Sequence, residues 1–348
     1  MRALVERFGV PLCPEPEVDQ GDPFLLEAPA GTSGHRFYVY VSGPGFPVYG
    51  SDDLTDWRRL GDSVPAGGDA STWAPCVRHV PGLDRPWVML YSRGRGSGDV
   101  DGHRGHRILR ADSDRPEGPF VDSGDVLTPD LDFAIDPDVS ADPAGGGPLL
   151  TFAADYVSDQ PYGTGLFEAA VRPDLRGLLS PPRPVARPRS DWQLYDGARS
   201  MPWKEIPGVS WAAGETVRWY TMEGPAAVLS PGGRRTLLYS GGNFAGFYGV
   251  GVLQTDPSGR WVDLSPTPQD CLLAPMPERG VYGPGHCSVL ETDAAPERQV
   301  LCFHFRTAPG APRQFGILPL SWTGDRPYCP VPGAGADPAT RPNGRPRT

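Results

Sequence analysis

Short apolar runs bounded by turn residues recur along the chain and predict β-strands rather than helices. Residues 24–26 and 226–229 have the length of a strand, and Gly or Pro interrupts almost every window that is long enough for a helix. Further apolar runs follow each opening, such as residues 87–92 and then 108–111. The pattern therefore predicts an all-β protein made of repeated groups of strands.

The repeat has five units, and each opens with a turn that leads into an apolar strand. The openings lie at residues 22–24, 73–75, 135–137, 223–225 and 285–290. Five units of roughly 50–90 residues, each with about four antiparallel strands, predict a five-bladed β-propeller over residues 15–325. The innermost strand of each blade lines the axis of a propeller, so the openings would bring together Asp22, Trp73, Asp136, Glu223 and His286. A β-sandwich of unrelated strands is the alternative.

Several segments fall outside the repeat. Residues 1–14 form an N-terminal segment, and residues 93–106 are predicted to be a loop at the rim. Residues 190–221 are a Trp-rich insertion between the third and fourth units. Residues 326–348 are rich in Pro, Gly, Ala and Arg, and we expect a disordered tail there.

Composition supports a folded protein and disfavours some classes of binding partner. The chain has 45 Gly and 43 Pro, yet 39% of its residues are hydrophobic, which argues against disorder. A net charge of −10 disfavours nucleic-acid binding, because phosphates are repelled. No apolar leader or membrane-spanning run is visible, so we expect a cytoplasmic protein without a membrane partner. The six cysteines show no C-x-x-C spacing and are expected to be free thiols.

Three of the five openings place a carboxylate directly before a turn residue. Asp22 precedes Pro23, Asp136 precedes Pro137, and Glu223 precedes a Gly-Pro pair. A carboxylate at the mouth of a buried strand is unfavourable to hide and well placed for chemistry. The shared setting predicts one site that contains all three.

These motifs and their order resemble glycoside hydrolase family 43, a group of five-bladed propeller enzymes. The resemblance covers residues 15–325 and rests on residues 21–23, 47–57, 73–75, 113–120, 135–137, 223–225, 239–242 and 283–286. It implies an inverting glycosidase that requires no cofactor. Asp22 would be the general base, Glu223 the general acid, and Asp136 the residue that raises the pKa of the acid and holds it in position. Inversion needs the base and the acid about 6.5–9.5 Å apart, with a water between them.

Two other carboxylates are alternatives to members of the trio. Asp19 is a rival for the base, but neither Pro nor a strand directly follows it. Glu117 repeats the Glu-Gly-Pro tripeptide, but it follows a polar run and is predicted in a turn between outer strands.

Two basic side chains of the fifth unit are further candidates that the resemblance suggests. His286 is similar to the axial histidine of the family, which binds a metal in some members or contacts the acid. The metal would be a structural calcium, although no acidic cluster stands beside His286 in the sequence. A core histidine held by hydrogen bonds is the alternative. Arg306 resembles the arginine of the fifth blade, which would pair with Asp136 or Glu223, bind a sugar hydroxyl, or form a structural ion pair.

Aromatic residues near the openings are candidates for sugar stacking. Trp73 is the strongest, since an indole face suits a sugar ring, and Phe24 and Phe244 are weaker. Simple strand packing is the alternative for each.

The expected function is exo-hydrolysis of α-L-arabinofuranosides or β-xylosides, with a small carbohydrate or glycoside as substrate. A propeller that binds a sugar without cleaving it, or that serves as a biosynthetic scaffold, is the alternative. A retaining sister family that acts on fructosides is disfavoured, because residues 135–137 read Ile-Asp-Pro rather than Arg-Asp-Pro.

Overall fold

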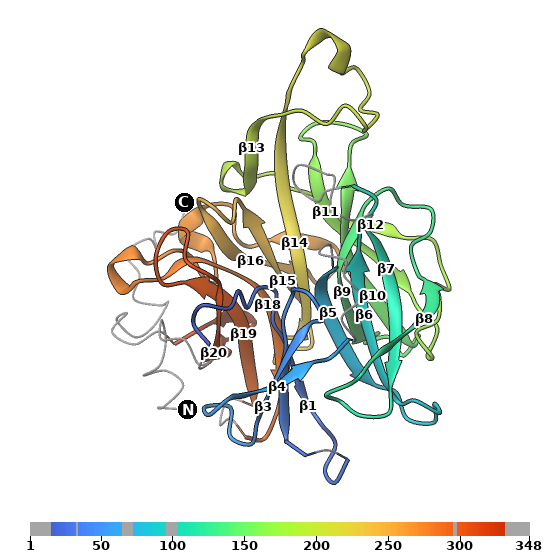
Figure 1. The fold of residues 1–348 in the computed structure, drawn as a ribbon. Helices are drawn as coiled ribbons and strands as arrows, with labels where there is room; N and C mark the ends of the chain where they lie inside the picture. Colours follow the sequence, from blue (N-terminus) through green and yellow to red (C-terminus); the bar gives the residue numbers. More distant parts are fainter. Residues whose placement is uncertain (1–14, 33, 65–71, 95–103, 295–297, 331–348) are drawn as a thin grey trace.

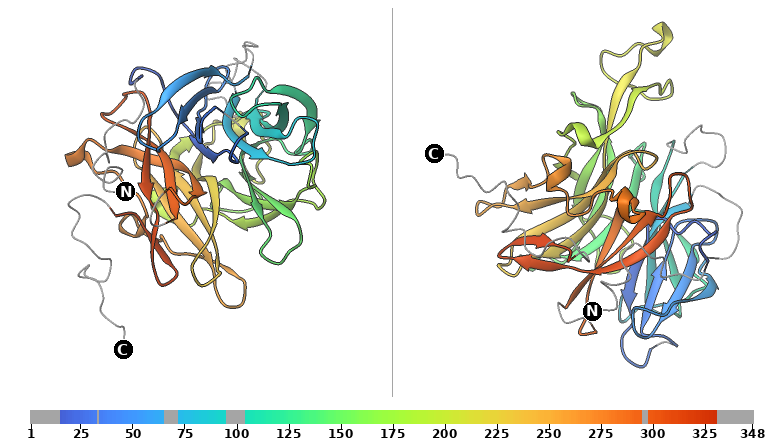
Figure 2. Two further views of the ribbon diagram at one scale, coloured as in Figure 1. Left: turned by 90° about the horizontal axis from the view of Figure 1, so that it is seen from below. Right: turned by 90° about the vertical axis from the view of Figure 1, so that its left-hand side faces the viewer.

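The structure is a computed structural model that describes residues 15–32, 34–64, 72–94, 104–294 and 298–330 (Figure 1). Its regular elements are β-strands apart from four short 3-10 helices within these ranges. Seen along the axis, the sheets stand around a common centre in chain order, as in a five-bladed β-propeller (Figure 2). The predictions of an all-β chain and of five blades are confirmed.

Blades one and two are four-stranded antiparallel sheets in which each strand pairs with its neighbour in the chain. Blade one contains β1 (Phe24–Glu27), β2 (Phe37–Tyr40), β3 (Pro47–Ser51) and β4 (Arg58–Asp62). Blade two contains β5 (Thr72–His79), β6 (Trp87–Arg93), β7 (Arg107–Ser113) and β8 (Val121–Val126). Strands β2 and β3 are buried throughout whereas β4 is mostly exposed, so the core lies toward the axis.

Blades three and four are joined at their edges. Blade three contains β9 (Ala134–Ala141), β10 (Pro148–Tyr156), β11 (Gly163–Ala170) and β12 (Arg183–Ala186). Blade four contains β14 (Val217–Leu229), β15 (Arg235–Gly242), β16 (Tyr248–Thr255) and β17 (Trp261–Asp263). The long strand β14 extends beyond its own blade, where Tyr220 and Thr221 pair in parallel with β11. The strand β13 (Leu194–Arg199) pairs with the same end of β14.

Blade five has three strands, followed by a separate hairpin. The blade contains β18 (Tyr282–Glu291), β19 (Gln299–Arg306) and β20 (Gln314–Pro319), and the hairpin contains β21 (Ser321–Thr323) and β22 (Arg326–Tyr328). Residues 326–328, which the prediction assigns to the tail, are instead paired with β21. The 3-10 helices are η1 (Asp191–Gln193), η2 (Trp211–Ala213), η3 (Pro268–Asp270) and η4 (Pro277–Arg279).

Blade one packs against blade five and so closes the ring. The rings of Trp57 and Phe315 meet edge to face at 5.5 Å between their centroids. The backbone N–H of Gln20 donates to the carbonyl of Arg313 at 2.8 Å. Aromatic packing and backbone pairing thus tie the beginning of the propeller to its end.

A kink marks the inner strand or its entry in every blade. The residue at each kink has a positive φ, as does Gly283 (52°) of blade five, and the five kink residues are Asp22 (52°), Ala74 (50°), Asp136 (58°), Gly224 (53°) and His286 (42°). Pro follows the first four and Cys287 follows the last. The left-handed region is unfavourable for residues other than Gly, and such strain is concentrated at functional sites. The five units have only loosely similar sequences, but the same backbone kink recurs in every blade.

The Trp-rich insertion forms an arm that projects from the end of the propeller at the top of Figure 1. It comprises η1, β13, η2 and the first residues of β14, so its predicted end at residue 221 lies inside a strand of blade four. The arm has a small core of its own, with Met201, Ile206 and Trp219 buried. Lys204, the only lysine, is buried and ion-paired with Asp155 of β10. The arm is thus packed against blade three as well.

Some predicted segments cannot be compared with the structure. The N-terminal segment 1–14, residues 95–103 of the predicted rim loop and residues 331–348 of the tail lie outside the described residues. Among the residues that are described, none belongs to a helix long and apolar enough to cross a membrane. The cysteines at positions 76, 271, 287, 302 and 329 are free, as expected.

Candidate active site

Side chains from four blades meet at the kinked ends of the inner strands. The Nδ1 atom of His286 lies 3.3 Å from Oδ1 of Asp22 and 3.9 Å from Oδ2 of Asp136. The same oxygen of Asp136 accepts the backbone N–H of Gly224, the neighbour of Glu223, at 2.9 Å. The structure therefore brings together Asp22, Asp136, Glu223 and His286 at one end of the axis.

Asp22 is surrounded by basic groups. Its Oδ1 atom lies 3.0 Å from Nη1 of Arg313 and 3.5 Å from Nδ1 of His304, and 13% of its side chain is exposed. Burial alone would raise the pKa of Asp22, but Arg313, His286 and His304 together hold that pKa well below its usual range. Asp22 is accordingly ionised at neutral pH and able to accept a proton.

Asp136 and Glu223 are perturbed in the opposite direction. Burial, followed by the charges of Glu223 and Asp22, raises the pKa of Asp136 well above its usual value. Burial is also the largest cause that raises the pKa of Glu223 to about 7, while a hydrogen bond from Tyr248 opposes the rise. Because both pKa values rise, the two side chains retain a proton between them near neutral pH. The pKa of Glu223 is thus raised mainly because burial removes water from its carboxyl group, rather than by a neighbouring charge.

Arg313 is a residue of this site that the sequence analysis missed. Asp19 accepts hydrogen bonds from its Nε at 2.9 Å, its Nη2 at 2.6 Å and its backbone N–H at 2.7 Å. A Cβ atom on Gly21 would lie 1.8 Å from the guanidinium carbon of Arg313. Asp19, considered above as a rival base, instead orients the arginine that faces Asp22. The glycine at position 21 was the one signal in the sequence.

Tyr248 and His304 are the other missed residues, and both are buried. The Tyr248 hydroxyl donates to Oε1 of Glu223 at 2.6 Å. The Nδ1 atom of His304 accepts the backbone N–H of Asp22 at 3.1 Å. Neither residue stands beside a turn motif, so nothing local in the sequence distinguished them.

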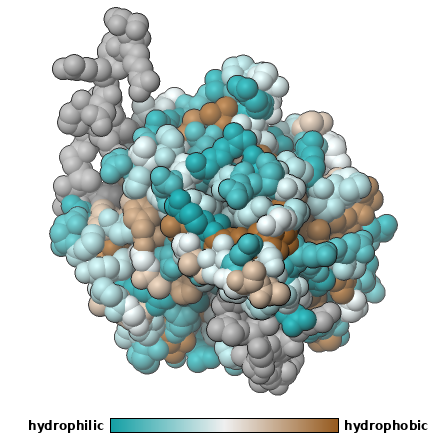
Figure 3. Space-filling view, turned by 90° about the horizontal axis from the view of Figure 1, so that it is seen from above, coloured by the Kyte–Doolittle hydropathy of each residue, from teal (hydrophilic) through white to brown (hydrophobic). Residues whose placement is uncertain are grey.

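Trp73 lies where the sequence placed it, on the inner strand of blade two beside the kinked Ala74. Its half-buried ring stacks on His106, with 3.9 Å between centroids and 24° between planes. His106 in turn meets Phe133 edge to face at 5.8 Å. One face of the indole is therefore held by packing. Figure 3 views the molecule from the side of the arm and shows apolar surface near the middle of this face, among hydrophilic side chains.

The remaining predicted contact residues lie in three different settings. Phe24 is buried, and the guanidinium of Arg78 covers its ring at 4.7 Å, so the expected sugar stacking gives way to packing inside the axis. Phe244 is 47% exposed and lies 6.1 Å from the ring of Tyr195 in the arm. Arg306 donates to the carbonyl of Ala311 in the turn that leads to β20, whereas Arg313 provides the guanidinium beside Asp22.

The surroundings of His286 do not fit a calcium site. Calcium takes six to eight oxygen ligands. Across the described ranges, no group of three or more His, Cys, Asp or Glu side chains is arranged to hold a metal ion. The two carboxylates nearest to His286 are Asp22 and Asp136, which belong to the trio itself.

The arrangement suits acid–base hydrolysis of a bond between a carbon atom and a leaving oxygen. An ionised carboxylate can take a proton from water, and a carboxyl that stays protonated near pH 7 can give one to a leaving oxygen. The opposed pKa shifts of Asp22 and Glu223 separate these two roles.

Comparison with known proteins gives a family match over most of the chain. The family model described as "Glycosyl hydrolases family 43" matches residues 19–327. No curated protein matches the chain.

Solved structures with a similar fold have low sequence identity. A thermostable family-43 glycoside hydrolase is 24% identical with a TM-score of 0.68, and the match covers 93% of this chain and 97% of that one. An endo-1,4-beta-xylanase from Bacteroides thetaiotaomicron is 22% identical with a TM-score of 0.66, over 90% and 95% of the two chains. An exo-1,5-alpha-L-arabinanase from a bovine ruminal metagenomic library is 18% identical with a TM-score of 0.61, over 90% and 96%.

Proposed function

Because the chain belongs to glycosyl hydrolase family 43, a family of inverting glycosidases, we propose that it removes α-L-arabinofuranosyl or β-xylosyl units from the ends of small glycosides. One observation carries the assignment of roles. At one end of the axis, an ionised Asp22 lies beside two carboxyls, Asp136 and Glu223, whose pKa values are raised.

In the proposed reaction, Asp22 accepts a proton from a water molecule as the water oxygen bonds to the anomeric carbon. The bond from that carbon to the leaving oxygen breaks, and Glu223 gives its proton to the leaving oxygen. The water attacks from the face opposite the leaving group, so the anomeric configuration inverts. Asp136 accepts the backbone N–H of Gly224 and so holds the neighbouring acid in place.

The choice of sugar is supported by the names of the similar structures and by the arm. One of them is named for xylan and another for arabinan, at comparably low identity. Pentose-containing glycosides are the substrates that these names share. The arm adds Tyr195 beside the exposed Phe244, and these rings offer an aromatic surface on which a sugar ring can stack.

Two further parts of the proposal concern the setting of the enzyme. The family is generally free of cofactors, and we propose that this chain needs none, since the described residues around His286 do not supply a calcium site. We also propose a cytoplasmic location, supported by five free cysteines, because oxidising compartments favour disulfides. Activity after dialysis against a chelator tests the first, and fractionation of the producing cells tests the second.

The test is hydrolysis of nitrophenyl α-L-arabinofuranoside and nitrophenyl β-xyloside, with the first-formed anomer of the sugar followed by NMR. We expect release of one sugar with inversion by wild type and clearly slower release by Glu223→Gln. Glu117→Gln is the matched control, since Glu117 carries the same tripeptide in an outer turn of blade two. Release of neither sugar, or equal release by Glu223→Gln, would overturn the proposal. Tight glycoside binding without turnover would support a binding protein instead.

A further inference from the structure

Tyr248 holds the carboxyl group of Glu223 from within the same blade. Its hydroxyl donates to Oε1 at 2.6 Å, and the ring is 2% exposed. Glu223 itself retains some exposed surface at the mouth. The hydrogen bond occupies one carboxyl oxygen and leaves the other, Oε2, to carry a proton toward a substrate.

The ring of Tyr248 also connects the acid to the base. It lies parallel to the ring of His304, with 5.8 Å between centroids and 3° between planes. His304 accepts the backbone N–H of Asp22 at 3.1 Å. An unbroken series of contacts therefore runs from the carboxyl of Glu223 to the backbone of Asp22, across blades four, five and one.

Strand β18 is shaped to admit this ring. A Cβ atom on Gly285 would lie 2.1 Å from Cε1 and 2.4 Å from Cδ1 of Tyr248. Any side chain at position 285 would therefore push the ring away from Glu223. Gly285, the second glycine of the Gly-Pro-Gly stretch at residues 283–285, is therefore explained by the closeness of Tyr248 rather than by a turn.

We propose that Tyr248 is the positioning residue of the general acid, and that its stack on His304 fixes the acid relative to the base. The proposal rests on the proposed function, since it assigns a partner to the acid of that reaction. Tyr248 does not itself touch the reacting atoms in this scheme. It acts through Glu223.

The hydrogen bond has a consequence for the pH profile. A donor to a carboxylate stabilises the ionised form, so the bond from Tyr248 lowers the pKa of Glu223 against the larger effect of burial. The titratable and charged groups around Glu223 are Asp22, Asp136, Arg199, Tyr248, His286 and Arg313. Removing the hydroxyl leaves the others in place and raises the pKa of the acid.

Tyr248→Phe tests the proposal because it keeps the ring and removes the hydroxyl. We expect kcat on a methyl pentoside to fall by about tenfold to a hundredfold with little change in KM, because the acid is misoriented. The alkaline limb of the profile of kcat/KM against pH should move to higher pH. A dinitrophenyl pentoside, whose leaving group needs no proton, should be hydrolysed at a rate within about threefold of wild type.

Tyr239→Phe is the matched control. Tyr239 is a buried tyrosine of the same blade whose hydroxyl donates to a different carboxylate, Asp263, at 3.0 Å. It should change neither the profile nor the dependence on the leaving group. Gly285→Ala, which crowds the ring without altering Tyr248, should reproduce the selective loss on the methyl glycoside.

The outcomes separate this proposal from the proposed function. If wild type cleaves pentosides but Tyr248→Phe loses equal activity on both leaving groups, or none, Tyr248 has no positioning role. If wild type cleaves no pentoside, the proposed function fails. NMR titration of the protein with carboxyl-labelled glutamate then tests the hydrogen bond between Tyr248 and Glu223 by itself. The signal that is missing in Glu223→Gln identifies Glu223. An unchanged pKa of Glu223 in Tyr248→Phe would overturn the proposal there too.

Discussion

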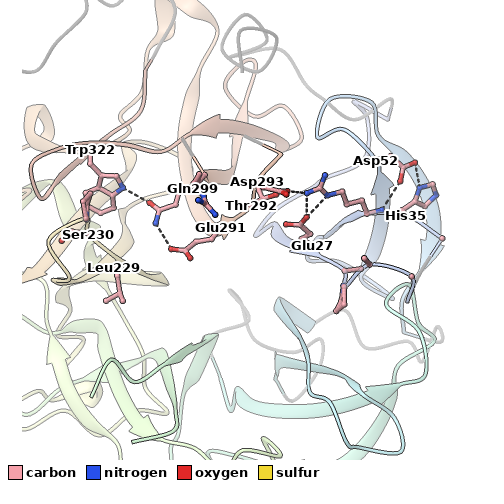
Figure 4. Close-up of a pocket in the computed structure, with 18 residues that line it drawn as sticks. Glu27, His35, Asp52, Leu229, Ser230, Glu291, Thr292, Asp293, Gln299 and Trp322 are labelled. Carbon is pink, nitrogen blue, oxygen red and sulfur yellow. Dashed lines mark hydrogen bonds and ion pairs between the residues drawn. The ribbon is translucent and has the colours of Figure 1, made fainter. Parts of the chain in front are cut away.

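The two ends of the propeller axis carry similar side chains in different surroundings. The end opposite the arm has a hollow of about 1180 Å³ whose lining includes Glu27, Arg36, Glu291 and Asp293 (Figure 4). At the end that holds the acidic trio, Asp22 and Asp136 line a small cavity of about 20 Å³. The larger opening therefore lies away from the perturbed carboxyls, and the size of a cavity does not locate the chemistry here.

The charges at the two ends differ in exposure. Arg36 pairs with Glu27 and Asp293, and its own side chain is 41% exposed. At the other end, burial raises the pKa values of Asp136 and Glu223 while Arg313 and its neighbours lower that of Asp22. Ion pairs in water contribute little to stability and perturb their members weakly. Removal of water, rather than the presence of acidic residues, distinguishes the reactive end.

The strongest test of this difference is the removal of one carboxylate from each end. Asp22→Asn should lower kcat on the preferred nitrophenyl pentoside by about 10²–10⁴-fold, because the water loses its general base. Glu27→Gln, at the end of β1 in the same blade, should leave kcat within about twofold of wild type. Initial rates at saturating substrate measure both. A comparable loss in the two variants would mean that the hollow, too, takes part in the reaction.

The carboxyl trio could be predicted because turn chemistry is local. Pro after Asp22 and after Asp136 marks the kink that brings each side chain to the axis, and five repeats imply a ring. The similarity of the three sequence motifs nevertheless conceals a shift of one residue in the position of the backbone kink. In blades one and three the carboxylate itself has the positive φ, whereas in blade four Gly224 has it and Glu223 precedes it. Only the backbone shows that the acid approaches the site from a different position.

Tyr248, His304 and Arg313 could not be predicted, because strand register rather than sequence brings them to the trio. Tyr248 lies on β16, the third strand of blade four, and His304 lies on β19, the second strand of blade five. Arg313 lies in the turn before β20. The family resemblance indicates Arg306 instead, yet Arg306 donates to the carbonyl of Ala311. The usable signals were glycines, since Gly21 and Gly285 each make room for one of the missed side chains.

The second test compares stability at two pH values. The pKa of Glu223 is raised from 4.5 to about 7 in the folded protein. Its protonated form is therefore favoured by folding, and that stability is fully present below about pH 4.5 and lost as the pH rises through 7. Glutamine stays neutral, so Glu223→Gln should be more stable than wild type by about 3 kcal/mol at pH 8 and nearly equal at pH 4. Urea unfolding at both pH values measures this difference.

Glu27→Gln is again the control from the opposite end. Its exposed ion pair predicts a change below about 1 kcal/mol at either pH. If Glu223→Gln were destabilised at pH 8, burial would not be the main cause of the raised pKa, and the contrast between the two ends would lose its physical basis.

The smallest expected effect comes from one methyl group on each of two glycines. In Gly21→Ala the new Cβ would overlap the guanidinium of Arg313, which must move away from Asp22. The pKa of Asp22 then rises, so the acid limb of kcat/KM should move up by roughly one pH unit. In Gly34→Ala, at the hollow, the Cβ would meet nothing within 4 Å and the limb should stay in place. Profiles of both variants, extended below pH 3 as far as the wild type remains folded, give the comparison. Since each variant adds the same methyl group to the same blade, a shift in Gly21→Ala alone would show that the acidity of the base depends on how closely one arginine can approach, and an unmoved limb would mean that Arg313 does not set it.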